Sequence, residues 1–198
     1  MKHVYGLLGI MVSVMMLLAT SNAKAEQGDY LVSGFNDGTL VNTLGETWEV
    51  WLKDAGDDPT QTCKISVVEG DALNYPSGKS MKLEYDVDSE NPAYNGARMA
   101  LKDFNASGYG FLNLYVKGDP QAGFTFKLKI EVIGPTHRPS PYILEGINDQ
   151  WQKFTIPLTE FWVVNDWSKL YQFVVVFDDI NSNPKTGTIY IDEVSFTK

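Results

Sequence analysis

The sequence contains almost no cysteine and very little histidine. Cys63 is the only cysteine, so the chain cannot form an internal disulfide bond. Cys63 alternates with Ile65 and Val67, which predicts a buried and unreactive thiol. Of the two histidines, only His137 lies outside the N-terminal leader. Zinc sites rich in histidine and serine-histidine triads would therefore depend on this one residue. Without a disulfide, stability must come from a hydrophobic core or a bound metal.

The sequence also lacks an apolar run long enough to span a membrane. The longest run, residues 4–19, is shorter than the roughly 20 residues that a membrane helix needs. It follows Lys2 and precedes Ala23-Lys24-Ala25, an A-x-A cleavage site, so residues 1–25 are expected to be a secretory signal peptide. An uncleaved anchor is the alternative interpretation. No cysteine follows the run as a lipoprotein would require, and we expect a secreted or periplasmic protein that begins at Glu26.

Positive charge is scarce. The chain has 16 Lys and Arg against 25 Asp and Glu, a formal net charge of −9. This balance argues against nucleic acids and anionic membrane surfaces as partners and leaves neutral or cationic ones. Phosphate-binding and dinucleotide-binding glycine motifs are absent as well. Residues 26–198 have the length of a single domain.

A sustained helical period is missing, and two-residue alternation dominates instead. In "SMKLEYDVD" (80–88) and "FTFKLKIEV" (124–132), every second residue is apolar. "FVVVF" (173–177) is apolar throughout, which is typical of a strand covered on both faces. Turn motifs such as "FNDGT", "YPSGK", "IGPTHRPSP" and "NSNPKTG" separate these runs and indicate about nine strands. We predict an all-β fold, a two-sheet β-sandwich of jelly-roll type.

The alternation slips once in the last predicted strand. Ile189 and Ile191 share one phase, whereas Val194 and Phe196 share the other, so the phase changes at Asp192-Glu193. A β-bulge would restore the apolar face. The carboxylate of Asp192 then lies in a buried strand and needs a partner.

The order of the segments resembles a known family. "FNDGT", "GKSMKLEY", "YNGARMAL", "WQKFTIPLTEF" and "GTIYIDEVSF" are similar to the galactose-binding-like jelly-roll modules, and above all to the family-eleven carbohydrate-binding modules of bacterial β-glucanases. The resemblance implies a non-catalytic sandwich that binds a polysaccharide or oligosaccharide, such as a β-glucan, on one sheet. It also implies a structural calcium ion and, as a partner, a separate glycoside hydrolase or surface protein. Distant relatives of the mitochondrial complex I assembly type share the fold and bind no sugar, so a secreted interaction or surface-structural protein is the alternative.

The resemblance implies calcium ligands near the two ends of the domain. Asp37 and Asp192 would supply carboxylates, and carbonyls near Thr39 and Lys82 would complete the oxygen shell. The alternative interpretation of Asp37 is an ordinary Asp-Gly turn.

Sugar recognition needs flat aromatic rings and planar polar groups that hydrogen-bond to pairs of hydroxyls. Candidates lie on the polar sides of the predicted strands or follow the proline-rich turn: Tyr94, Arg98, Lys127, Lys129, Glu131 and Tyr142. For each of them the alternative is a solvated sheet face or an edge tyrosine.

The tryptophans are expected to lie mostly in the core, as Trp151 and Trp167 do in the resembled family. Trp48 and Trp51 differ in strand phase, so one of the two should face outward. Glu131 and Glu145 could serve as the carboxylate pair of a glycosidase, which keeps an enzyme as a third hypothesis.

Overall fold

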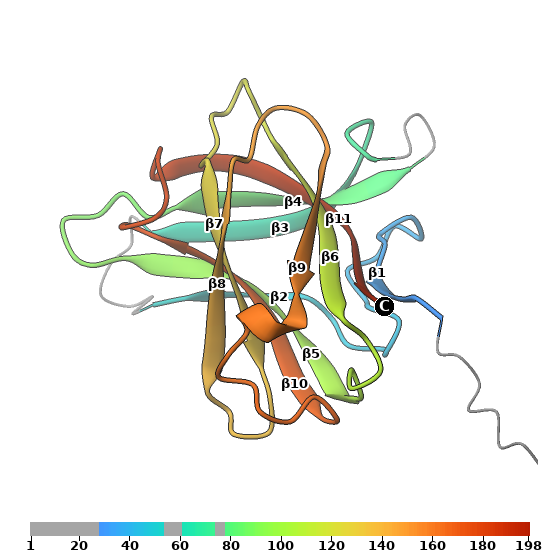
Figure 1. Ribbon diagram of the computed structural model, residues 1–198. Coiled ribbons are helices and arrows are strands. Elements are labelled where there is room, and N and C mark those ends of the chain that lie inside the picture. The colour runs from blue at the N-terminus through green and yellow to red at the C-terminus, as the bar shows by residue number, and fades with distance from the viewer. Residues whose placement is uncertain (1–27, 54–60, 74–77) are drawn as a thin grey trace, which may run out of the picture.

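The computed structural model describes residues 28–53, 61–73 and 78–198. The expected signal peptide, residues 1–25, lies outside this part of the chain. The described residues form two antiparallel sheets that face each other (Figure 1), as the sequence predicts. They include one short 3₁₀ turn, η1 (Leu158–Glu160). No helix within them is long and apolar enough to cross a membrane.

Each sheet combines strands from distant parts of the sequence. The six-stranded sheet has, in order, β3 (Thr62–Glu69), β4 (Lys79–Asp86), β11 (Thr186–Thr197), β6 (Phe111–Gly118) and β9 (Gln152–Pro157), with β1 (Tyr30–Ser33) also paired to β11. The five-stranded sheet has β2 (Glu49–Leu52), β5 (Tyr94–Phe104), β10 (Leu170–Asp178), β7 (Lys127–Ile133) and β8 (Pro139–Glu145). The blue β1 lies beside the red end of β11 in Figure 1, so the first and last strands are neighbours.

The described residues hold eleven strands, more than the nine or so expected. Two of the additional strands, β1 and β2, have only four residues each, too few for alternation to be visible in the sequence. β8 begins inside the segment that the sequence analysis assigned to a turn, because it carries Pro139 and Pro141. Proline is tolerated there because β8 lies at the edge of its sheet.

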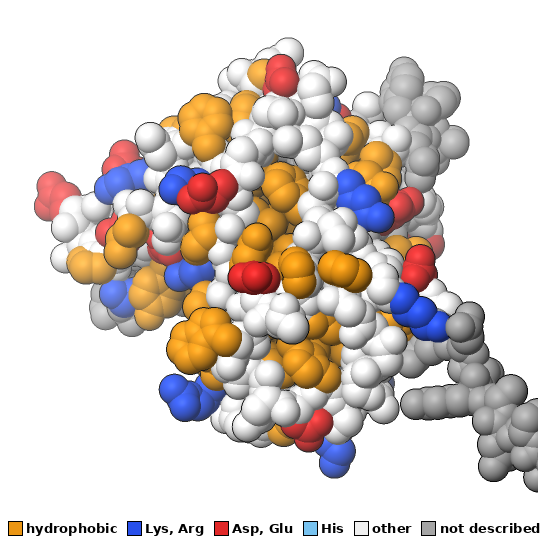
Figure 2. Space-filling model, viewed as in Figure 1, with side chains coloured by type: hydrophobic (Ala, Val, Ile, Leu, Met, Phe, Trp, Pro, Cys, Tyr) orange, Lys and Arg blue, Asp and Glu red, His pale blue; other side chains and the backbone are white. Residues whose placement is uncertain are grey.

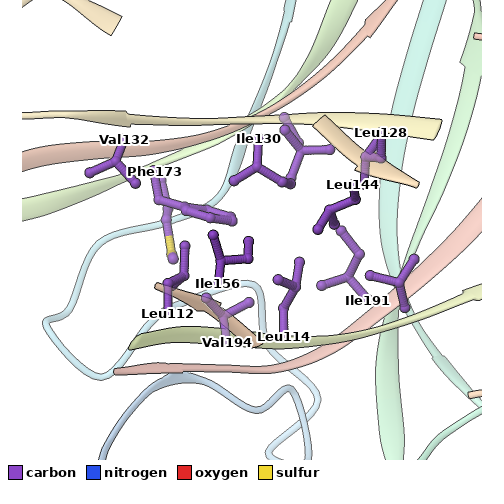
Figure 3. Packing of buried hydrophobic residues seen from close by; sticks show 14 of the residues in the cluster. Leu112, Leu114, Leu128, Ile130, Val132, Leu144, Ile156, Phe173, Ile191 and Val194 are labelled. Carbon is purple, nitrogen blue, oxygen red and sulfur yellow. The ribbon is translucent and has the colours of Figure 1, made fainter. Parts of the chain in front are cut away.

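The core lies between the sheets and confirms the predicted alternation. Figure 3 shows Leu112, Leu114 and Ile191 of the six-stranded sheet pointing toward Ile130 and Phe173 of the other sheet. Cys63 is buried, and burial raises the pKa of its thiol to about 12, which agrees with an unreactive side chain. Trp48 is also buried, and its Nε1 donates a hydrogen bond to Ser33 Oγ at 3.0 Å.

The predicted bulge in β11 is present. The pairing with β6 shifts between Asp192 and Ser195, and Glu193 adopts a positive φ of 46°. The shift returns Val194 and Phe196 to the core side. Asp192 consequently faces away from the core although it is fully buried.

Candidate functional site: the outer face of the five-stranded sheet

The strand register gathers five of the six predicted sugar-site residues on one surface. Along one row, Trp51, Gly96, Val176 and Lys129 lie opposite one another, and along the next, Glu49, Arg98, Val174 and Glu131 do so. These side chains point away from the core. We call this surface the outer face; its members are Glu49, Trp51, Tyr94, Gly96, Arg98, Ala100, Lys127, Lys129, Glu131, Gln172, Val174, Val176, Asp178 and Glu145.

The floor of the outer face is apolar and consists of small residues. Val174 and Val176 point away from the core, yet their exposed fractions are only 5% and 3%. Gly96 and Ala100 on the adjacent β5 add almost no height. The long polar side chains of β5 and β7 rise on both sides of these small residues and cover most of their surface. This explains why "FVVVF" is apolar at every position, as the sequence predicts for a doubly covered strand.

An aromatic pair stands at one side of the outer face. The rings of Trp51 and Tyr94 lie 5.7 Å apart between centroids, and Tyr94 is 41% exposed. Lys53 Nζ lies 5.1 Å from the Tyr94 centroid. Trp51 Nε1 has no hydrogen-bond partner in the described part of the chain. Of the two tryptophans that the sequence left undecided, Trp51 is therefore the outward one, since it shares strand phase with Glu49.

Most charges of the outer face are paired. Arg98 lies 3.5 Å from Glu49, Lys127 lies 2.6 Å from Glu145, and Lys129 lies 2.8 Å from Asp178. Figure 2 likewise shows Lys or Arg side chains interspersed with Asp and Glu on the visible face. A surface with balanced charges suits a neutral ligand better than an ionic one.

Glu131 is the exception to this pairing. It forms no ion pair within the described residues, and burial raises the pKa of its carboxyl, with Lys129 acting in the opposite direction. Asp178 shows the contrasting case: its pKa is lowered, because hydrogen bonds from Lys129 and Asn181 outweigh the effect of burial. Glu131 therefore retains hydrogen-bonding capacity for a ligand.

Tyr142 does not join the other five predicted residues. The register places it opposite Ile130, whose side chain is in the core, so the Tyr142 ring points inward and lies 6.0 Å from Phe161. The sequence analysis missed this because the two prolines of β8 hid the strand and its phase. The structure thus corrects the placement of Tyr142.

The four expected calcium ligands are only partly assembled. Both oxygens of the exposed Asp37 accept hydrogen bonds from Thr39, from its N–H at 2.9 Å and from its hydroxyl at 3.0 Å. Lys82 lies inside β4 with ladders on both sides, so its backbone belongs to the sheet. Among the described residues, no three His, Cys, Asp or Glu side chains form a group that could hold a metal.

Asp192 is the one expected ligand that fits a cation. Oδ1 accepts a hydrogen bond from the Glu193 N–H at 2.8 Å, whereas Oδ2 is buried and has no hydrogen-bond partner in the described ranges. Burial raises its pKa to about 6. The turn at Asn36 is hydrogen-bonded to the start of β4. Asn36 Oδ1 accepts a hydrogen bond from the Lys79 N–H at 2.9 Å. A cation here would draw its other ligands from backbone oxygens, which calcium accepts.

The two carboxylates named for the glycosidase hypothesis, Glu131 and Glu145, lie far apart. Glu145 lies opposite Lys127, and Glu131 lies four residues further along β7. That separation is roughly 13 Å along a strand, beyond the roughly 5 to 9.5 Å that separates the two carboxyl groups of glycosidases. The arrangement supports binding by stacking and hydrogen bonds.

Comparisons with known proteins identify the family of the chain. The family model of carbohydrate binding domain 30 matches residues 28–198. No curated protein matches the sequence at a significant level. Many solved structures share the fold.

Several of the similar structures are carbohydrate-binding modules. The family 11 module of the Clostridium thermocellum cellulase Lic26A-Cel5E has a TM-score of 0.61 at 14% identity, covering 86% of this chain and 94% of that one. The same family's module from that organism, in complex with a β-1,3-1,4-mixed-linked tetrasaccharide, has a TM-score of 0.62 at 14% identity over 86% and 95%. A family 28 module specific for non-crystalline cellulose has a TM-score of 0.55 at 16% identity over 84% and 94%.

At these identities the structures establish a shared fold, which confirms the resemblance drawn from the sequence. The match to the family model is the broader result, because it extends over both sheets and every strand of the described chain. The protein belongs to the carbohydrate binding domain 30 family.

Proposed function

We propose that this protein is a secreted, non-catalytic module that binds a β-glucan-like polysaccharide on the outer face and is stabilised by a calcium ion. The observation that carries the proposal is the pairing of Trp51 with the exposed Tyr94, beside the small residues Gly96 and Val176. The exposed ring of Tyr94, packed beside Trp51, offers a flat apolar surface to the C–H face of a pyranose.

Polar groups around this platform are suited to sugar hydroxyls. The Arg98 guanidinium offers several donors in one plane, and Glu131 offers acceptors that no ion pair occupies. The balanced charge of the outer face favours a neutral glycan. The likeness in fold to a family 11 module whose structure contains a mixed-linked tetrasaccharide supports the same ligand class.

Affinity electrophoresis in gels containing soluble β-1,3-1,4-glucan tests the proposal. The mature protein should be retarded, with an affinity in the micromolar to millimolar range, because one or two stacked rings and a few hydrogen bonds provide roughly 4 to 8 kcal/mol. The glucan should remain intact. Trp51→Ala should abolish the retardation, and Arg98→Ala should reduce it.

Trp162→Ala is the matched control, because Trp162 is 77% exposed and is not part of the outer face. Retardation that survives Trp51→Ala but is lost in Trp162→Ala would move the site to the loop after η1. Absence of retardation across a broad glycan panel would favour the alternative, an interaction protein that uses the same fold without sugar.

The argument for a bound calcium ion rests on Asp192 alone, since the described residues contain no cluster of acidic side chains. Its buried, unpartnered Oδ2 needs a positive partner at neutral pH, and a calcium ion bonded to it and to backbone oxygens would provide one. The ion would stabilise β11 at its bulge and would take no part in sugar binding.

A further inference from the structure

A small polar pocket lies on the outer face, at a distance from the aromatic pair. It has a volume of about 190 Å³ and lies between residues 45–47 and the side chains of Glu49, Arg98, Ala100 and Gln172. Its lining is mostly polar and includes no aromatic ring. Whatever fills this pocket is held by hydrogen bonds and not by stacking.

The outer wall of the pocket is firmly built. The buried Asn42 side chain accepts hydrogen bonds from the N–H groups of Leu44 and Glu46, both at 3.0 Å, and donates one to the Ala100 carbonyl at 2.9 Å. Gly45 completes the loop with a φ of 83°. The Glu46 carboxylate is tied to Lys102 at 2.9 Å. Because the loop is already fixed in this way, ligand binding would not have to overcome the entropic cost of ordering it.

Gln172 supplies the unused polar group of the pocket. Its side chain is half-buried on β10, opposite Ala100, and makes no hydrogen bond within the described chain. An amide presents both donors and an acceptor, so it can bridge two neighbouring sugar hydroxyls. Arg98, at the long distance of 3.5 Å from Glu49, faces the same space.

The spacing between pocket and platform defines the length of a ligand that reaches both. Trp51 lies opposite Gly96, whereas Gln172 lies opposite Ala100, four residues further along β5. Four residues of strand span roughly 13 Å, and β2 and β10 lie about 10 Å apart across β5, so the two positions are roughly 16 Å apart. A disaccharide is shorter than this, and a tetrasaccharide is long enough.

We propose that this pocket is an end subsite of the same glycan site, in which Gln172 binds the hydroxyls of a sugar ring whose chain also stacks on Trp51. The proposal rests on the proposed function of the outer face. It assigns a second role to the region: the platform provides affinity for any β-linked glucose ring, and the pocket selects chains of more than two residues with a matching hydroxyl pattern.

Titration calorimetry with β-1,4-linked glucose oligosaccharides of two and four residues tests this. Wild type should bind the tetrasaccharide at least tenfold more tightly than the disaccharide. Gln172→Ala should weaken tetrasaccharide binding about fivefold to tenfold, the effect of losing one or two hydrogen bonds, and leave disaccharide binding unchanged. Trp51→Ala should weaken both. Gln121→Ala, a change in the exposed loop before β7, should match wild type.

Circular dichroism and thermal melting should show that Gln172→Ala is folded. Equal wild-type affinity for the two oligosaccharides, or an unchanged tetrasaccharide affinity in Gln172→Ala, overturns the end subsite. The proposed function stands in that case if Trp51→Ala still abolishes binding. Failure of wild type to bind either oligosaccharide or the polysaccharide overturns both proposals.

Discussion

Glu131 is a carboxyl group on the outer face whose folded-state pKa is raised by burial. As pH rises from acidic values, the unfolded chain releases this proton first, since its pKa is the ordinary one. The folded state releases it only at higher pH. Between these two pKa values the folded state binds more protons, so this residue lowers the free energy of unfolding as pH rises.

We therefore expect Glu131→Gln to gain stability relative to wild type as pH rises from about 4, near the ordinary carboxyl pKa, toward neutral. Urea unfolding of both proteins at several pH values measures the difference. Glu160→Gln, a change of an exposed carboxyl in η1, provides the baseline. A difference between Glu131→Gln and wild type that stays constant with pH, or shrinks as pH rises, would contradict the expectation.

β5 approaches β10 more closely at Gly96 than a side chain would allow. A Cβ built at this position would lie 1.9 Å from the backbone carbonyl oxygen of Val175. Backbone atoms inside a sheet cannot move away cheaply. Glycine at this position permits the close pairing of β5 with β10. It also leaves the surface beside Trp51 without a side chain.

Gly96→Ala should lower the free energy of unfolding by about 2 to 4 kcal/mol, because relief of the clash requires the two central strands to separate locally. Denaturant unfolding measures the loss. Gly110→Ala serves as the control, since its added Cβ would make only an ordinary contact, 3.6 Å from Lys198. Similar stabilities of the two variants would show that the sheet absorbs the methyl group.

The strands differ in how well the sequence predicts them. β4 and β7 were visible because each has seven or more residues with strict alternation, whereas β1 and β2 are shorter than one full pattern. β8 was hidden by its prolines, and with it the inward direction of Tyr142. Hydrophobic periodicity compares each residue only with its neighbours in the sequence. It cannot predict a strand that forms because of pairing with a distant partner strand.

At the scale of the molecule, the candidate site was predictable in part. Strand phase alone placed Arg98, Lys129 and Glu131 on a polar side, and the register then brought them together. Gln172 could not be found in this way, because it precedes an apolar run and its role depends on a loop from another part of the chain. Pockets arise from tertiary contacts, and no local pattern encodes them.

The calcium proposal concerns the stability of the whole domain. An ion that binds only the folded state raises the melting temperature by mass action, so wild type should melt higher in millimolar calcium than in chelator. Asp192→Asn should abolish this difference. In chelator it should be at least as stable as wild type, because it removes a buried charge without a partner.

Differential scanning calorimetry with metal analysis of each sample measures both effects. Asp37→Asn tests whether the turn before β2 contributes a ligand, and a retained calcium effect in that variant would restrict the site to Asp192 and backbone oxygens. Identical wild-type melting temperatures with calcium and after verified metal removal would exclude the ion.

The pairing of β1 with β11 determines how the domain responds to a mechanical load. Tyr30, at the beginning of β1, lies opposite Phe196, near the end of β11. Force that pulls the two chain ends apart therefore acts on one end of the ladder and breaks its hydrogen bonds one after another, as in opening a zipper. Single-molecule stretching should show β1 detaching at low force, before the sheet that carries the outer face yields.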